Sequence, residues 1–316
     1  MGMNRRPPAA LLWPRYWPVW LGVGLFRLTV LLPYRLQLIL GRALGRLLYL
    51  ALPRRRRVAA INLALCFPEL DEAQRTRLVK EHFASLGCSA FEIPMSWWAS
   101  DERLAPLCHL QGLEHLQAAA AKGRGVILLS GHLTDLEIGA RLLLPHARFH
   151  AMYRPQRNPV IEWVMAGSRE RHCEKAISRY AAKGMIRSLR EGHTVWYAPD
   201  QNANRKEGIF VEFFGVPAST NSGTARLAKM TGAPVVPFYV GRREDGSGYD
   251  LILEPPLTDF PSGDLHADTL RINRVIESHI RRSPAQYLWI HRRFRTRPGP
   301  DDPSPYGELG GKRRKK

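Results

Sequence analysis

His132, Asp135 and Glu137 stand close together at the point where a buried strand is expected to give way to a helix. The apolar run 126–129 and a Ser-Gly pair precede them, and an amphipathic run follows. A neutral imidazole, with a pKa near ~6.5, is suited to taking a proton from a hydroxyl. A carboxylate bonded to the other ring nitrogen fixes the tautomer and stabilises the imidazolium. These residue types therefore indicate general-base chemistry on an alcohol.

The sequence leaves open which acid is the partner of His132. At about 100° per residue, His132 lies ~60° from Asp135 and ~140° from Glu137 if all three are helical. A His132–Glu137 pair therefore requires His132 to lie in the turn before the helix, which the flexible Gly131 permits. Helix capping is the alternative explanation of the acids, because carboxylates are favoured at a helix N-terminus without any catalytic role.

Strands and helices alternate from residue 58 onward. Apolar runs predict strands at 125–130, 148–154, 174–178, 194–199, 209–214, 234–243 and 249–257, the last two joined as a hairpin. Amphipathic runs predict helices at 71–92, 112–123, 133–144, 158–171, 183–192, 222–232 and 265–282. This order predicts a three-layer α/β sandwich around a mostly parallel mixed sheet. Ligands gather at the carboxyl ends of such strands, where His132, Arg154 and Asp200 are expected.

The positive charge is concentrated at the two ends of the chain. The formal net charge is +19, yet residues 1–68 contain eleven arginines and no acid, residues 281–316 carry a net charge of +8, and residues 69–280 are neutral. This distribution favours contact of the ends with an anionic surface. It disfavours a nucleic-acid-binding protein, because the neutral body offers no continuous basic face.

An apolar segment rich in Trp and Tyr occupies residues 13–40. It is long enough to span a bilayer, but Arg27 and Arg35 interrupt it, so a single span, an interfacial anchor and a cleaved signal all remain open. We expect an N-terminal membrane-anchoring helix within a hydrophobic anchor with a basic flank at 1–57. A catalytic domain at 58–297 and a disordered basic tail at 298–316 should follow. The four cysteines have no C-x-x-C spacing, so no metal site is expected.

A series of motifs in order resembles one enzyme family. The His-x4-Glu spacing of His132 and Glu137 is similar to the signature of glycerolipid acyltransferases. "PRYWPVWLGVG", "NLALCFPEL", "EIPMSWW", "YRPQRNP", "KGMIRSL", "VWYAPDQ", "FVEFFGVPASTNSGTARLAKMTGAPVVPF" and "WIHRRFRTRPG" resemble the lipid A secondary acyltransferases of Gram-negative bacteria, and within them the lauroyl branch. The resemblance covers residues 14–299.

This resemblance implies transfer of a medium-chain acyl group, lauroyl by the closest branch, to a hydroxyl of a lipid A precursor that carries Kdo sugars. The donor is the thioester of acyl carrier protein, a co-substrate, and no cofactor is implied. The enzyme would act at the inner membrane, with its catalytic domain on the cytoplasmic side. No serine or cysteine elbow motif appears, which favours direct attack by the acceptor hydroxyl over an acyl-enzyme.

The resemblance also suggests roles for individual residues. His132 would be the base and Glu137 the carboxylate that orients it. Arg169, or alternatively Arg171, would stabilise the oxyanion, with Asp200 and Arg154 in supporting roles; exposed ion pairs are the alternative for the two arginines. Phe213 and Phe214 would line a hydrocarbon groove, and Arg292 and Arg293 would contact the carrier or a phosphate.

Two other functions remain. The first is an acyltransferase of the same superfamily that uses acyl-CoA or another acceptor, such as a phospholipid, a glycosylated inositol lipid or an ornithine lipid. The second is a non-catalytic, basic membrane-binding protein, which the presence of both His132 and Glu137 disfavours, because a binding module needs neither.

Overall fold

The strand β2 (Val126–Leu129) forms the centre of the fold, because all four of its residues are buried. Its side chains alternate between two hydrophobic cores: Ile127 and Leu129 belong to one, and Val126 and Leu128 to the other. A strand with apolar residues on both faces needs a layer of structure on each side. The computed structural model describes residues 6–153, 155–172, 175–178, 182–299 and 301–307.

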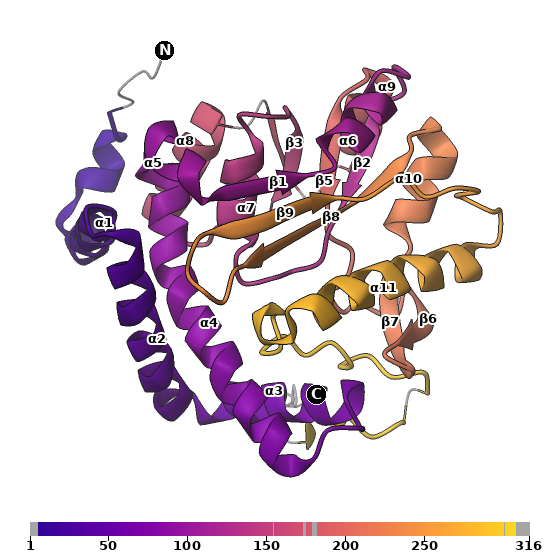
Figure 1. Ribbon diagram of the computed structural model, residues 1–316, viewed down its shortest axis with the longest axis horizontal. Helices are drawn as coiled ribbons and strands as arrows, with labels where there is room; N and C mark the ends of the chain where they lie inside the picture. The colour runs from indigo at the N-terminus through magenta and orange to yellow at the C-terminus, as the bar shows by residue number, and fades with distance from the viewer. Residues whose placement is uncertain (1–5, 154, 173–174, 179–181, 300, 308–316) are drawn as a thin grey trace.

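Seven of the described strands form one sheet in the order β1-β9-β8-β2-β5-β3-β4 (Figure 1). Only β8 and β9 pair in antiparallel fashion within it, as the predicted hairpin. The mostly parallel mixed sheet is therefore confirmed. The other strands of this sheet are β1 (Cys108–Gln111), β3 (His150–Tyr153), β4 (Lys175–Ser178), β5 (Thr194–Tyr197), β8 (Val235–Arg242) and β9 (Tyr249–Leu253).

Helices cover both faces of the sheet. The core around Ile127 includes residues of α3 (Pro53–Cys66), α9 (Ala182–Arg190), α10 (Gly223–Thr231) and α11 (Leu265–Arg282). The core around Val126 includes α6 (Leu113–Ala120) and α7 (Leu136–Leu143). The long α4 (Glu72–Trp98) contributes to both cores and begins with a capping box, in which Asp71 and Gln74 satisfy each other's backbone N–H groups. Two further described helices are the short α5 (Asp101–Leu104) and α8 (Pro159–His172).

A buried ion pair fastens α4 to the sheet. Arg242, at the end of β8, donates from Nη2 to Oε2 of Glu92 at 2.7 Å, and its Nε bonds the other carboxylate oxygen at 2.5 Å. The Tyr249 hydroxyl donates to the same carboxylate at 2.6 Å. Paired and hydrogen-bonded charges are the form in which ions are tolerated inside a protein, so this cluster fixes the position of α4.

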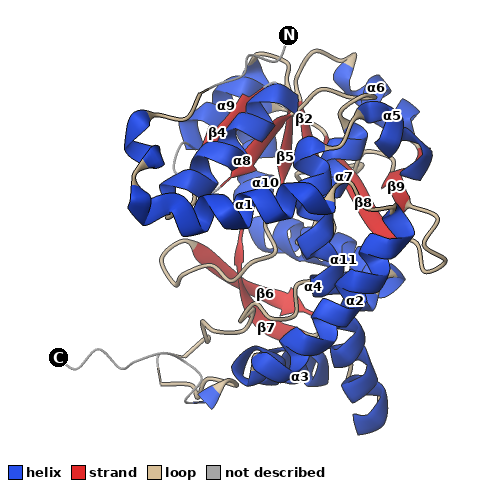
Figure 2. Cartoon of the chain, turned by 90° about the vertical axis from the view of Figure 1, so that its left-hand side faces the viewer, coloured by secondary structure: helices blue, strands red, loops and turns tan. Residues whose placement is uncertain are grey.

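The N-terminal region forms two helices along the outer side of α4, namely α1 (Trp17–Thr29) and α2 (Tyr34–Ala51) (Figure 2). Among the described residues, no individual helix has the length and apolar character needed to cross a bilayer. The pair α2 and α3 meets the criterion of length and composition jointly, with a bend of 97° between them.

Three parts of the fold differ from the sequence-based expectation. The strand β1 was not expected, and neither was β7 (Val216–Asn221), which pairs with β6 (Gly208–Phe213) in a separate hairpin beneath α11 (Figures 1 and 2). The predicted tail also begins too early. Tyr306 is buried, accepts a hydrogen bond from the Phe294 amide at 3.0 Å and donates one to Asn62 at 2.6 Å.

Candidate active site

His132 lies in the loop between β2 and α7, three residues before the N-cap of the helix. The sequence predicts this position before the helix on the condition that His132 and Glu137 form a pair. Gly131 fits here because of close packing: a Cβ at this position would lie 2.9 Å from a methyl group of Ile276 on α11. The loop is also pinned by backbone hydrogen bonds, Leu288 N–H to the His132 carbonyl at 3.0 Å and Thr134 N–H to the Gln286 carbonyl at 2.7 Å.

Asp200 fixes the imidazole. It follows β5, the parallel neighbour of β2, so the sheet brings both strand ends together. One carboxylate oxygen lies 2.6 Å from Nδ1 of His132, and the other accepts the backbone N–H of His132 at 2.9 Å. The Asp200 side chain is fully buried, whereas that of His132 is 28% exposed. This geometry defines the tautomer with Nδ1 protonated and Nε2 available to accept a proton.

The electrostatics of this pair suit a base. Burial by itself would lower the pKa of His132, but the charge of Asp200 and its hydrogen bond outweigh burial and raise the pKa above the ordinary value. Burial would raise the pKa of Asp200, yet the interaction with His132 and a hydrogen bond from Tyr287 lower it to about 2. The carboxylate is therefore charged at neutral pH, and it is placed to stabilise an imidazolium at His132 if the ring takes up a proton.

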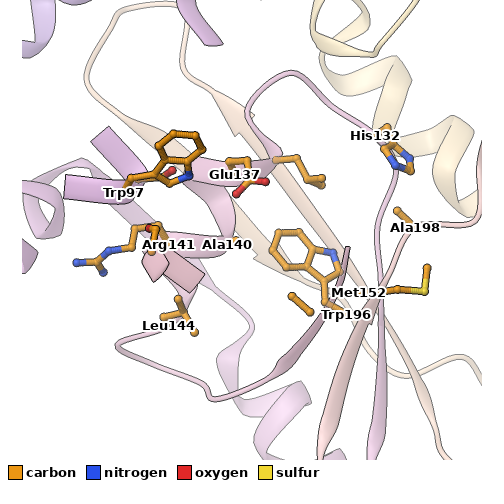
Figure 3. Close-up of a pocket in the computed structure, with 13 residues that line it drawn as sticks. Trp97, His132, Glu137, Ala140, Arg141, Leu144, Met152, Trp196 and Ala198 are labelled. Carbon is orange, nitrogen blue, oxygen red and sulfur yellow. The ribbon is translucent and has the colours of Figure 1, made fainter. Parts of the chain in front are cut away.

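A largely apolar pocket adjoins His132 (Figure 3). Its wall includes one side of α7, formed by Leu136, Glu137, Ala140 and Arg141, together with Leu144 directly after the helix. The remaining wall residues are Ser96, Trp97, Ala151, Met152, Ser168, Trp196 and Ala198. Figure 3 shows Arg141 and Leu144 at the end of the pocket far from His132. An apolar pocket with a base at one end can hold a hydrocarbon chain whose reactive group lies beside that base.

Comparison with known proteins identifies the family. The family model for bacterial lipid A biosynthesis acyltransferase matches residues 7–296. The chain is 41% identical to the lipid A biosynthesis lauroyltransferase of Escherichia coli K12, over 92% of this chain and 95% of that protein. It is 38% identical to the palmitoleoyltransferase of the same strain, over 90% and 93% of the two chains, and 32% identical to the myristoyltransferase, over 93% and 91%. The chain belongs to the lipid A biosynthesis acyltransferase family. It is an acyltransferase.

The geometry of this acyltransferase changes the expected role of Glu137. The carboxylate on Nδ1 of His132 is that of Asp200 and not that of Glu137. Glu137 lies in the first turn of α7, lines the pocket, and stands apart from the His132 ring in Figure 3. The expected position of Glu137 on Nδ1 of His132 is therefore corrected to Asp200, and a catalytic role for Glu137 stays a prediction. A helical residue five positions after His132 is directed along the pocket, whereas Asp200 approaches from the adjacent strand.

Asp135, the other acid near His132, also serves elsewhere. It occupies the N-cap position of α7, but its side chain makes no capping hydrogen bond. One carboxylate oxygen instead accepts the backbone N–H of Arg242 at 2.8 Å, and the whole side chain is buried. Burial is the main cause that raises the pKa of Asp135 to about 7. This acid therefore connects the loop that carries His132 to β8.

The expected oxyanion-stabilising residues cannot be placed at the level of side chains. Arg169 and Arg171 lie on the C-terminal half of α8, and their side chains are outside the described part of the structure. Arg154 is outside the described residues altogether. Ser168, which immediately precedes Arg169, does line the pocket. Their roles in this acyltransferase stay predictions.

The expected hydrocarbon-binding residues, Phe213 and Phe214, do not line the pocket. Phe213 is fully buried in the core, and Phe214 packs against Phe67 and Trp289 with ring centroids 5.1 and 6.3 Å apart. Trp97 and Trp196 are among the residues that do line the pocket. The sequence did indicate another part of the pocket wall, the apolar face of the helix that follows His132, where Leu136 and the small Ala140 lie.

Arg293 is not a docking residue for a carrier. Only 2% of it is exposed, its guanidinium donates to the Ser219 carbonyl at 2.8 Å and to Oγ1 of Thr220 at 2.5 Å, and it lies over the Phe213 ring. It holds the β6–β7 hairpin against the body of the acyltransferase. Arg292 is half-buried, with its Nε inside the protein. The expected contact of this pair with the carrier is therefore corrected for Arg293 and stays a prediction for Arg292.

Proposed function

We propose that this acyltransferase moves a medium-chain acyl group from the thioester of acyl carrier protein to a hydroxyl of a lipid A precursor. The observation that carries the proposal is the His132–Asp200 pair at one end of an apolar pocket, in a chain of the lipid A acyltransferase family. A base beside a hydrocarbon site is the arrangement that acyl transfer to an alcohol needs.

The proposed reaction begins when the acceptor hydroxyl attacks the thioester carbonyl carbon. Nε2 of His132 removes the hydroxyl proton as the C–O bond forms, and the charge of Asp200 stabilises the resulting imidazolium. The tetrahedral intermediate carries an oxyanion, for which Arg169 is the expected partner. When the intermediate collapses, the C–S bond breaks and the imidazolium gives its proton to the sulfur. The products are an ester and the free thiol of the carrier.

The acyl chain is proposed to lie along α7, toward Leu144. Ala140 is one turn after Leu136 and Leu144 is one turn further, so the three share a face of the helix that runs along the pocket. The relatives are named for lauroyl, palmitoleoyl and myristoyl groups. We propose a medium chain, with lauroyl as the first candidate because the relative with 41% identity is a lauroyltransferase.

The location is part of the same proposal. We place the enzyme at the inner membrane, anchored through residues 1–57, with the catalytic domain on the cytoplasmic side. Eleven arginines and no acids in residues 1–68 favour anionic lipid, and the acidic carrier would be attracted to the basic ends.

The test is transfer by the purified full-length protein in mixed micelles that contain the Kdo-bearing lipid A precursor. Lauroyl, myristoyl and palmitoleoyl thioesters of acyl carrier protein would each be supplied, with lauroyl-CoA as an alternative donor, and the products would be analysed by mass spectrometry. We expect lauroyl transfer from the carrier and its loss in His132→Ala. Transfer only from the CoA thioester, or only to a phospholipid acceptor, would contradict the proposal.

A further inference from the structure

The helix α2 presents a continuous apolar stripe to the outside of the protein. Leu36, Ile39, Leu40, Leu47 and Leu50 are between 39% and 69% exposed. At about 100° per residue these five side chains fall within an arc of about 100° on one side of the helix. An exposed helix face in water normally carries polar residues, so a stripe of five large apolar side chains requires a covering.

A row of arginines runs along one edge of this stripe. Arg35, Arg42 and Arg46 are exposed and fall within an arc of about 40° that begins roughly 20° beyond the apolar residues. No acidic residue occurs in the first 68 positions. The outer surface of α2 therefore consists of two adjoining strips, one apolar and one cationic.

The third side of α2 is fixed to the catalytic domain. Gln37, Leu38, Gly41 and Gly45 are buried, and the two glycines meet Gly87 of α4. A Cβ on Gly87 would lie 2.0 Å from the Gly41 carbonyl oxygen and 2.4 Å from the Gly45 nitrogen, so only glycine allows this approach of the two backbones. The C-terminal end of α4 supplies Ser96 and Trp97 to the pocket. Whatever covers the stripe is therefore held in a fixed orientation relative to the active site.

We propose that α2 lies in the plane of an anionic bilayer, with the stripe in the acyl-chain boundary and the arginine row at the level of the lipid phosphates. This inference adds a rigid membrane contact and an orientation to the anchor in the proposed function, and it does not depend on which acyl group is transferred. An apolar strip bordered by cations matches a lipid interface, where hydrocarbon lies beneath phosphate.

Neither of the other candidate occupants fits this surface as well. A second copy of the chain could cover the leucines, but its own first 68 residues bring further arginines and no acid to pair with the arginine row. An acidic carrier protein would match the arginines but would leave the leucines without an apolar partner.

The helix α1 extends the same kind of surface. Trp17, Leu21, Leu25 and Leu28 are each more than half exposed and fall within an arc of about 80°. On another part of α1, Trp20 packs against Trp163 of α8, with ring centroids 5.7 Å apart. Because α8 also contributes Ser168 to the pocket wall, the membrane contact and the acyl site border on the same helix.

Vesicle flotation of the full-length protein tests the apolar stripe separately from α1. The double variant Ile39→Asp/Leu47→Asp leaves α1 intact. We expect its partition coefficient on vesicles with phosphatidylglycerol to fall at least about a hundredfold, since each large side chain that loses its apolar contact costs about tenfold or more. Met230→Asp, which changes an exposed apolar residue on α10, is the control and should bind as wild type. Ile39 and Leu47 are both exposed in the structure, so the unfolding temperature of the double variant should stay close to that of the wild type. Unchanged vesicle binding of the double variant would overturn the proposal.

The arginine row has its own expected signature. In Arg35→Gln/Arg42→Gln/Arg46→Gln, binding to phosphatidylglycerol vesicles should fall roughly a hundredfold, at about 1 kcal/mol per arginine, while weak binding to neutral phosphatidylcholine vesicles stays the same. Equal loss on both kinds of vesicle would contradict a phosphate-level location for these residues.

A depth measurement decides between a bilayer and a protein partner. A fluorescent label on Leu47→Cys should be quenched by lipids brominated on their acyl chains, and a label on Met230→Cys should not. If the label on residue 47 remained accessible to aqueous quenchers on vesicles, or if stripe variants abolished a dimer without affecting vesicle binding, the stripe would be a protein interface and the proposal would be wrong.

Discussion

Replacing Asp200 with Asn separates the two acids that compete for the role of partner to His132. The substitution keeps the size of the side chain and removes the charge that lies 2.6 Å from Nδ1 of His132. The Asp200 charge and its hydrogen bond raise the pKa of His132, so they would stabilise an imidazolium at this position. A hydrogen bond to a charged group is worth about 1.5–3 kcal/mol, which corresponds to about 10- to 150-fold in rate. Loss of the fixed tautomer adds to it, so we expect kcat to fall by about 10²–10⁴-fold.

The pH dependence supplies a second readout with a definite sign. A base must be neutral to act, so the wild-type rate should rise as the pH passes through the pKa of His132. The charge and hydrogen bond of Asp200 raise this pKa, and burial opposes them. In Asp200→Asn the carboxylate charge is gone, and burial, which lowers the pKa of His132, is no longer offset by it. The midpoint of the pH–rate profile should therefore move to lower pH. The rate at the high-pH plateau should also be much lower than in the wild type.

The assay is steady-state lauroyl transfer measured by mass spectrometry over about pH 5 to 9. Glu137→Gln is the matched control, because Glu137 lines the same pocket but is not on Nδ1. It should leave the midpoint in place. If Glu137→Gln shifted the midpoint and Asp200→Asn did not, the pairing expected from the family motif would be correct and our reading of the geometry would be refuted.

Three further predictions concern stability and specificity. Arg242→Met leaves Glu92 buried without its cation, so it should lower the free energy of unfolding by about 3–5 kcal/mol in chemical denaturation. The control Arg243→Met loses an exposed pair with Asp250 at 3.9 Å and should lower it by less than about 1 kcal/mol. Ala140→Leu should shift the preferred acyl chain to a shorter one in donor competition, by roughly fourfold per methylene excluded, with the exposed Ala121→Leu as control. Burial raises the pKa of Asp135 from 3.8 to about 7, so the wild type should lose stability as pH rises across that interval. Asp135→Asn should not show this loss, and its transfer rate should stay within a few-fold of wild type; a rate as low as that of Asp200→Asn would show that Asp135 acts on His132.

Local patterns were sufficient to predict much of the fold. The buried run of β2, the hairpin of β8 and β9, and the helix Leu265–Arg282 follow from apolar periodicity and turn residues within each segment. The strand β7 was missed because its sequence contains a proline and several small polar residues, with no alternation of apolar side chains. Its partner β6 and the buried Arg293 hold it in place, and those contacts are not local.

The same limit explains the wrong partner for His132. Glu137 is close in the sequence, and the family spacing pointed to it. Asp200 becomes a neighbour only because β5 lies directly beside β2 in the sheet, with Leu129 opposite Tyr197. Strand order depends on how distant segments pack, and nothing in either strand specifies which other strand it will join. The buried pair of Arg242 and Glu92 is hidden for the same reason, since 150 residues separate its members.

Whether His132 and Asp200 act as one unit can be measured directly. Asp200 is buried and reaches the reaction only through the imidazole, so its contribution should disappear when the imidazole is absent. His132→Ala should reduce turnover by at least about 10²-fold, the low end for a positioned base. If Asp200 acted independently, the double variant His132→Ala/Asp200→Asn would lose the product of the two factors, about 10⁴-fold or more. Groups that form a single unit are strongly non-additive, so we expect the double variant to be hardly slower than His132→Ala alone. A multiplicative loss would mean that Asp200 contacts the substrate or supports the loop by another route.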